Sequence, residues 1–134
     1  MEAEILKQTL KGVLPPKSGM IPRLPLDRHK ADEEIQTMQV DDSIIAYITD
    51  IVQHTRQHPM IQWGSSARAG IALLLCGRIL AAIAGRDFVI PDDIKGIAVP
   101  VLGHRIRLTP EAQIADVTET NVIEEIIHQV AFPQ

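Results

Sequence analysis

The sequence has few aromatic residues, one cysteine and no long hydrophobic run free of charge, and each shortage excludes a class of protein. Aromatic residues make up 3% of the 134 residues, although 46% of all residues are hydrophobic. The core is therefore aliphatic, which favours packed helices over a sandwich or barrel built from aromatic and β-branched strands. A chain of this length predicts one domain of modest size.

The lone cysteine and the broken hydrophobic run set further limits. Cys76 has no partner for an internal disulfide and the N-terminus shows no signal peptide, so we expect a cytoplasmic protein with a buried, inert thiol. The most apolar stretch, residues 67–84, contains Arg68 and Arg78, whereas a membrane span needs about 20 residues with few charges. We expect no membrane span and interpret this stretch as a buried central helix.

Motifs for catalysis and for nucleotide binding are also missing. No Gly-x-x-x-x-Gly-Lys-Ser/Thr loop is present, so the chain lacks a phosphate site of its own. The acidic pairs at 41–42 and 92–93 precede predicted helices, where we interpret them as caps. His54 and His58 have the i, i+4 spacing of metal ligands, but neither a glutamate between them nor a third ligand is evident. We expect no metal site, and interpret this histidine pair as a solvated helix end.

The residue pattern predicts an all-α protein: a small helical bundle with a long central helix, preceded by a proline-rich linker. A short helix is predicted over 1–12, the extended linker over 13–25, a connection over 60–64 and an extended segment over 104–108. Apolar residues recur at helical spacing elsewhere, and capping residues stand where helices should begin. Four further helices are predicted over about 42–57, 66–84, 91–100 and 118–130, the third with a kinked extension to 102. Short helical turns are predicted within 31–39 and from 109.

Arg68 is the residue whose position most needs an explanation. It lies in residues 64–69 (GSSARA), in the first turn of the predicted central helix. A cation at this end opposes the helix macrodipole by about 0.3–1 kcal/mol, whereas the same end attracts anions. A phosphate bound to Arg68 would offset that cost. The alternative is an exposed arginine that extends its long stem into solvent.

A basic patch follows the helix predicted over 91–102. His104, Arg105 and Arg107 are close together in sequence, with Arg86 and Lys95 upstream. The patch is interpreted as a contact with phosphate, as a contact with an acidic patch on a neighbouring subunit, or as a solvated rim. The net charge of −4 argues against nucleic acid as the main partner.

Three segments, in this order and spacing, resemble one family. Residues 64–69 (GSSARA), 85–95 (GRDFVIPDDIK) and 100–105 (PVLGHR) are similar to the C-terminal lid of a MoxR-type AAA+ ATPase. The resemblance implies a helical AAA+ lid domain over 40–134, with residues 1–39 forming the end of the ATPase core and the linker. Two positions depart from the family pattern. Ala67 stands where proline is common, which makes the turn before the central helix less rigid. Ile90 stands where threonine or serine is usual, which leaves the helix predicted from residue 91 less well capped.

The resemblance also implies a function. The lid would close over ATP, bound with Mg²⁺ in a separate core, and Arg68 matches the sensor 2 arginine that approaches the γ-phosphate, with Ser66 beside it. His104 and Arg105 become candidate inter-subunit or phosphate contacts. The implied partners are the lid's own core, neighbouring subunits of a homo-oligomeric ring and, for some members, a von Willebrand A domain protein. The parent would couple ATP hydrolysis to chaperone-like remodelling, whereas this chain alone would not hydrolyse ATP.

A non-enzymatic interaction module is the alternative. A long apolar helix flanked by shorter ones also resembles histone-fold proteins, which pair through a hydrophobic surface. Obligate dimerisation would favour that alternative, and a monomer would favour the lid. A helix-turn-helix DNA-binding domain fits less well, because residues 59–65 are too long for its tight turn and the net charge is negative.

Overall fold

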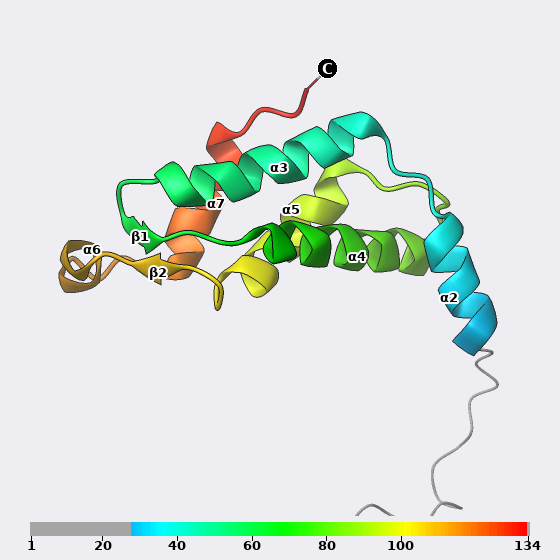
Figure 1. Cartoon of the computed structure of the whole chain (residues 1–134), viewed down its shortest axis with the longest axis horizontal. Coiled ribbons are helices and arrows are strands. Elements are labelled where there is room, and N and C mark those ends of the chain that lie inside the picture. The colour runs from blue at the N-terminus through cyan, green and yellow to red at the C-terminus, as the bar shows by residue number, and fades with distance from the viewer. Residues whose placement is uncertain (1–27, 134) are drawn as a thin grey trace, which may run out of the picture. The chain divides into compact units, whose positions relative to one another are not determined.

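The computed structural model describes residues 28–133, and one compact unit begins at Asp32 (Figure 1). The helix predicted over 1–12 and the linker predicted over 13–25 lie outside the described residues. Within them, the regular secondary structure is helical except for two very short strands, β1 and β2. The expected all-α bundle with a long central helix is therefore confirmed. The helices run over α2 (Arg28–Thr37), α3 (Asp42–Gln57), α4 (Ala67–Ile83), α5 (Pro91–Leu102), α6 (Pro110–Ile114) and α7 (Glu119–Gln129).

Local chemistry explains where the helices begin. The Asp41 carboxylate accepts the Ser43 N–H at 2.9 Å and starts α3, and the hydroxyls of Thr109 and Thr118 cap α6 and α7. Ile90 cannot cap α5, but the carboxylate of Asp93 reaches back to accept the Ile90 N–H at 2.9 Å. The predicted caps are thus confirmed, and an acid inside the first turn compensates for the weak cap at Ile90.

Helix α4 is the centre of the arrangement, and it packs against both α3 and α5. It ends before Gly85, whose φ of +72° suits a glycine in the left-handed region. One face of α4 is buried, through Ala69, Leu73, Gly77 and Ala81. The expectation of a buried central helix is confirmed for this face only, because the opposite face exposes a row of large apolar side chains: Ile71, Leu75, Ile79 and Ile83.

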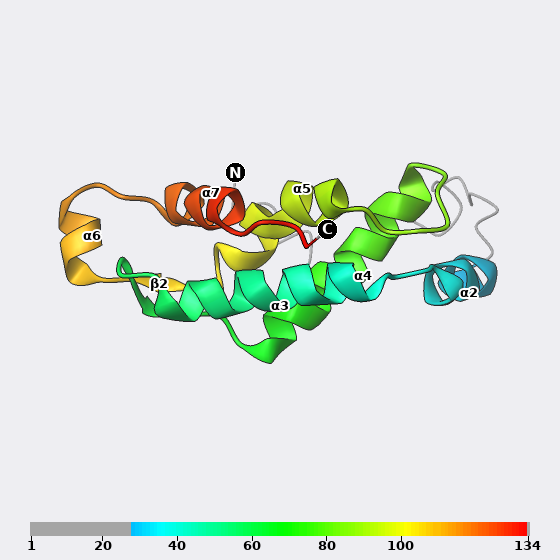
Figure 2. The same cartoon turned by 90° about the horizontal axis from the view of Figure 1, so that it is seen from above.

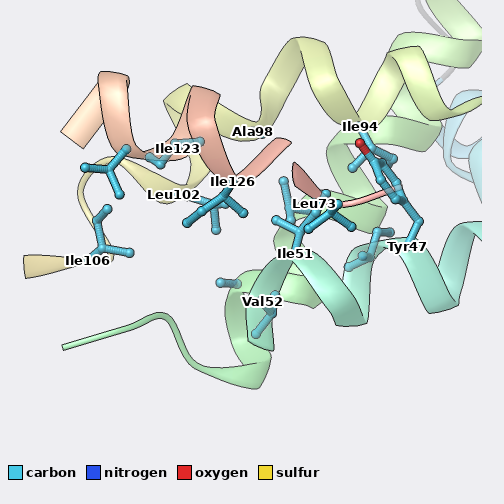
Figure 3. Packing of buried hydrophobic residues seen from close by; sticks show 14 of the residues in the cluster. Tyr47, Ile51, Val52, Leu73, Ile94, Ala98, Leu102, Ile106, Ile123 and Ile126 are labelled. Atoms are coloured by element: carbon cyan, nitrogen blue, oxygen red, sulfur yellow. The ribbon is translucent and has the colours of Figure 1, made fainter. Parts of the chain in front are cut away.

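Helices α5 and α7 complete the core. α5 continues through Pro100 to Leu102, and α7 packs against both α5 and α3. Figure 2 shows α5 and α7 on the same side of α3. Figure 3 shows the aliphatic interior, to which Ile51 of α3, Leu73 of α4 and Ile126 of α7 all contribute. No helix among residues 28–133 has the length and apolar content needed to cross a bilayer.

Tyr47 is the one large aromatic side chain in this interior. It is fully buried and meets Phe132 edge to face, with ring centroids 5.6 Å apart. Burial raises the pKa of the Tyr47 hydroxyl, and the nearby negative charge of Asp92 adds to the effect. The contact ties the segment after α7 to α3.

A two-stranded antiparallel sheet joins segments far apart in sequence. β1 (Ile61–Trp63) pairs with β2 (Arg107–Leu108), with Ile61 opposite Leu108 and Trp63 opposite Arg107. The extended segment predicted over 104–108 thus contains a strand. The prediction of a mere connection over 60–64 was wrong, because β1 forms only through this distant pairing.

Candidate functional site

The turn that leads into α4 is anchored to the end of α3 by buried hydrogen bonds. The Thr55 hydroxyl donates to the Val52 carbonyl at 2.7 Å, and its oxygen accepts the Ser65 N–H at 3.0 Å. The Ser65 hydroxyl lies 2.9 Å from the same oxygen, and donates to it because the single proton of Thr55 is already used. Thr55 and Ser65 are almost fully buried, so these bonds hold the turn firmly against α3.

Two more contacts complete the anchor. The Arg56 Nε donates to the Ser65 carbonyl at 2.8 Å. Gly64 lies so close to α3 that a Cβ atom placed there would stand 2.6 Å from the Arg56 Cα. Sequence reasoning missed Thr55 and Arg56, because their role depends on a contact between α3 and a turn nearly ten residues further on.

Arg68 lies one residue inside α4, immediately after this anchored turn. Its side chain is exposed and forms no ion pair with any residue in the described part of the chain. The N-cap residue Ser66 makes no capping hydrogen bond through its side chain. The hydroxyl of Ser66 and the guanidinium of Arg68 are therefore both available to a ligand.

The start of α4 differs from the starts of its neighbours. Among α3 to α7, each of the other four helices has an acidic residue in its first turn. α4 has none, and carries Arg68 there instead. The positive end of the α4 macrodipole and a cation are thus together, without a carboxylate to balance them. An anion is the partner that this arrangement suits chemically.

A phosphate group fits this site only in part. The donors are a guanidinium, a hydroxyl and helix N–H groups, which suit a terminal phosphate. Residues 28–133 hold no cluster of carboxylate, histidine or cysteine side chains that could bind a metal ion. The described residues therefore offer contacts to a phosphate, without a group of three metal-binding side chains to accompany it.

The exposed apolar row of α4 starts beside Arg68. Ile71, Leu75 and Ile79 follow Arg68 at the i+3, i+7 and i+11 positions, which share one helix face. An apolar groove of about 320 Å³ runs between α3 and α4 next to this row. Ile45, Val52, Arg56, Ala67, Gly70 and Leu74 are among the residues that line it.

The predicted basic patch divides into separate parts. His104, Arg105 and Arg107 are exposed at the end of α5 and in the strand that follows. Arg86 instead lies before the start of α5, about 18 Å away along a helix of this length. The five basic residues therefore do not form one site.

Arg86 belongs to a structural ion pair. Its two terminal nitrogens bind the two oxygens of Asp93 at 2.6 and 2.9 Å, and its guanidinium lies 5.8 Å from the Phe88 ring centre. Burial alone would raise the pKa of Asp93, but hydrogen bonds from Arg86 and the Ile90 N–H outweigh it, so the pKa of the carboxyl lies below its usual value of 3.8. The interpretation of the pair 92–93 as a cap is confirmed for Asp93.

Replacing Asp93 with asparagine is expected to lower the free energy of unfolding by about 2 kcal/mol at neutral pH, because a charged, buried acceptor is lost. Since folding lowers the pKa of Asp93, its contribution is present above the unfolded pKa of about 3.9 and is lost as pH falls through the folded value. The difference between variant and wild type should therefore shrink below about pH 4. Urea unfolding at several pH values measures it.

The neighbouring Asp92 provides the matched control. Its side chain is 80% exposed and lies 3.6 Å from Lys95, so Asp92→Asn should change stability by less than about 0.5 kcal/mol. Equal losses in Asp92→Asn and Asp93→Asn would show that the Arg86–Asp93 pair is not a stabilising contact.

The histidine pair does not form the solvated helix end predicted from the sequence. His58 lies just beyond α3, is buried, and accepts the Met60 N–H through Nδ1 at 3.2 Å. Its Nε2 lies 3.5 Å from Glu125 of α7. Pro59 forces the chain out of the helix here and turns His58 inward. Cys76 is half-buried, and thus less enclosed than expected.

Comparisons with known proteins identify the class of domain. A family profile described as the AAA lid domain matches residues 53–126. The chain belongs to the AAA lid domain family, and its relatives place it among the MoxR-type AAA+ proteins. This membership favours the lid over the histone-fold alternative.

Individual relatives support the assignment. The chain is 30% identical over 132 residues to "Chaperone MoxR1" of Mycobacterium tuberculosis, covering 92% of this chain and 35% of that protein. It is 44% identical over 100 residues to "Uncharacterized protein YeaC" of Bacillus subtilis, covering 75% and 31%. The crystal structure of a candidate ATPase from Cytophaga hutchinsonii matches with a TM-score of 0.75 and 31% identity, over 78% of this chain and 34% of that one. The chain thus spans about a third of the length of these relatives.

Proposed function

We propose that this chain is the lid that closes over ATP bound in a separate AAA+ core, and that Arg68 senses the γ-phosphate. The observation that carries the proposal is the position of Arg68: exposed, without an ionic partner among the described residues, and at a helix start that lacks any acidic residue. When bound, ATP would supply a terminal phosphate, which is the anion this site lacks. The relatives are AAA+ proteins, which supports ATP and Mg²⁺ in the full-length protein.

The anchored turn explains how Arg68 would act as a sensor. The Ser65 N–H donates to the Thr55 hydroxyl oxygen and the Ser65 carbonyl accepts from Arg56, which fixes the turn at residues 64–66 to α3. Arg68 follows this turn within the first turn of α4. A displacement of the Arg68 guanidinium would therefore move the packed helices α3 and α4 together rather than a loop alone. Arg68 would bind the phosphate, while Ser66 contributes a hydroxyl, and the lid would move as one body.

The exposed apolar row of α4 supports docking of the lid against its own core. Ile71, Leu75 and Ile79 share a helix face with Arg68, so a domain that presents a phosphate to Arg68 can also cover this row. For the full-length protein, lid and core together, we propose a ring of such subunits that remodels client proteins in a chaperone-like manner. A von Willebrand A domain protein would be a further partner. The name of the mycobacterial relative, a chaperone, is consistent with this role.

The 134-residue chain alone is expected to hydrolyse no ATP and to bind it only weakly, because one arginine cannot hold phosphate, metal and attacking water together. Phosphate release assays and calorimetric titration with Mg²⁺-ATP measure both properties. Steady turnover that survives in the Arg68→Ala variant would contradict the proposal. Light scattering provides a second check, since an obligate dimer would favour the interaction-module alternative.

A further inference from the structure

The single tryptophan is turned outward by an irregularity in β1. In a regular strand, Ile61 and Trp63 would point to the same face. Here Ile61 is buried while Trp63 is 68% exposed. The register explains the difference, because residues 61 and 63 pair with the adjacent residues Leu108 and Arg107, which leaves one extra residue in β1. Such bulges redirect side chains, and they occur often beside functional sites.

Two exposed arginines lie on the segment that faces Trp63, Arg107 in β2 and Arg105 in the turn between α5 and β2. Both arginines are exposed, whereas Ile106 and Leu108 are buried. Arg107 is the direct cross-strand partner of Trp63, which places both side chains on the same side of the sheet. Within residues 28–133, neither arginine forms an ion pair. We call the exposed group of Gln62, Trp63, Arg105 and Arg107 the tryptophan–arginine surface.

We propose that the tryptophan–arginine surface binds an extended acidic segment of a partner protein. Alternate residues of an extended partner are about 6.6 Å apart, a separation that the long, exposed side chains of Arg105 and Arg107 can span. Two carboxylates at i and i+2 of the partner can therefore pair with the two guanidinium groups. An apolar side chain of the partner would cover the indole of Trp63, the kind of anchor enriched at protein interfaces.

The charge balance favours a polypeptide over a nucleic acid. The chain carries a net charge of −4, so a polyanion that extends beyond two arginines meets mainly repulsion. A peptide can place two carboxylates on the arginines and remain neutral or apolar elsewhere. A small phosphate is also a poorer match, because both arginines are exposed and lie on different elements, Arg105 in a turn and Arg107 in β2.

The experiment uses Trp63 as its own reporter, since it is the only tryptophan in the chain. The 134-residue protein is titrated with a ten-residue peptide that carries one Glu-Leu-Glu sequence among neutral residues, and with a second peptide in which lysine replaces both glutamates. We expect the acidic peptide to shift the tryptophan emission to shorter wavelength as the indole is covered, and the basic peptide to leave the emission unchanged. Binding should weaken as salt concentration rises.

Matched variants separate the surface from overall charge. Arg107→Gln should weaken binding of the acidic peptide about tenfold, because a charge-assisted hydrogen bond is lost. Lys95→Gln removes one positive charge from α5, outside the tryptophan–arginine surface, and should change the affinity less than about twofold. Both side chains are exposed, and circular dichroism confirms that each variant is folded.

Three results would overturn the proposal. The first is an emission spectrum unchanged at millimolar acidic peptide. The second is tighter binding of a single-stranded oligonucleotide of ten nucleotides, which would assign the surface to nucleic acid. The third is a shift that appears with rising protein concentration alone, which would assign it to a second copy of this chain. None of these readouts depends on ATP, so the role proposed for Arg68 is tested separately.

Discussion

Replacing Arg68 with alanine in the full-length protein, lid and core together, is expected to lower ATP turnover by about 10²–10³-fold. This is the usual loss when one preorganised donor to developing charge is removed from an active site. The start of α4 would keep its backbone N–H groups, but these alone would not follow the γ-phosphate. Steady-state hydrolysis with saturating Mg²⁺-ATP measures the effect.

The loss should fall on turnover and on nucleotide-driven motion more than on folding. The Arg68 side chain is exposed and makes no ion pair in the described residues, so the variant should unfold at the wild-type temperature or slightly above it, since a cation leaves the positive end of the helix. Small-angle scattering with and without nucleotide would test whether lid closure is lost. Lys95→Ala, which removes a cation from α5, is the matched control and should retain turnover.

Arg68→Lys distinguishes the two ways in which Arg68 can act. If the residue supplies only positive charge, lysine should restore most of the turnover. If it binds two phosphate oxygens with its planar guanidinium, lysine should restore little. Wild-type turnover in Arg68→Ala would show that the sensor role is wrong.

The helices could be predicted from the sequence because their signals are local. Caps at Asp41, Thr109 and Thr118, and the glycine at 85, depend on contacts within a few residues. The strand β1 could not be predicted, because three residues are too few to show periodicity and its partner lies more than forty residues further on. Arg68 could be singled out from the sequence because a cation in the first turn of a helix opposes the macrodipole, and this signal is local.

The burial of α4 was predicted correctly for one face only, and the reason is physical. A helix that is apolar all round indicates burial on every side, but not which molecule provides the cover. In this chain α3 and α5 cover one side, and Ile71, Leu75 and Ile79 remain exposed on the other. The apolar pattern of α4 therefore predicted burial on every side, whereas the described residues cover one side only.

Replacing Gly64 with alanine is expected to destabilise the chain by about 3 kcal/mol, which is near the upper end for overpacking. The new Cβ would stand 2.6 Å from both the Thr55 carbonyl oxygen and the Arg56 Cα. These are backbone atoms in the last turns of α3, so they cannot move aside as a flexible side chain would. To relieve the clash, the turn must leave α3, and the buried bonds between Thr55 and Ser65 would break.

Gly96→Ala is the matched control for this prediction. Gly96 lies inside α5, and a Cβ atom at this position would meet no neighbouring element within 4 Å, so alanine should stabilise the chain by about 0.5–1 kcal/mol through helix propensity. Thermal unfolding should place the two variants on opposite sides of the wild type, with Gly64→Ala lower by roughly 10 °C. If Gly64→Ala unfolded at the same temperature as the wild type, the turn would not pack on α3 as described. Arg68 would then lack the rigid support on which its proposed role as a sensor depends.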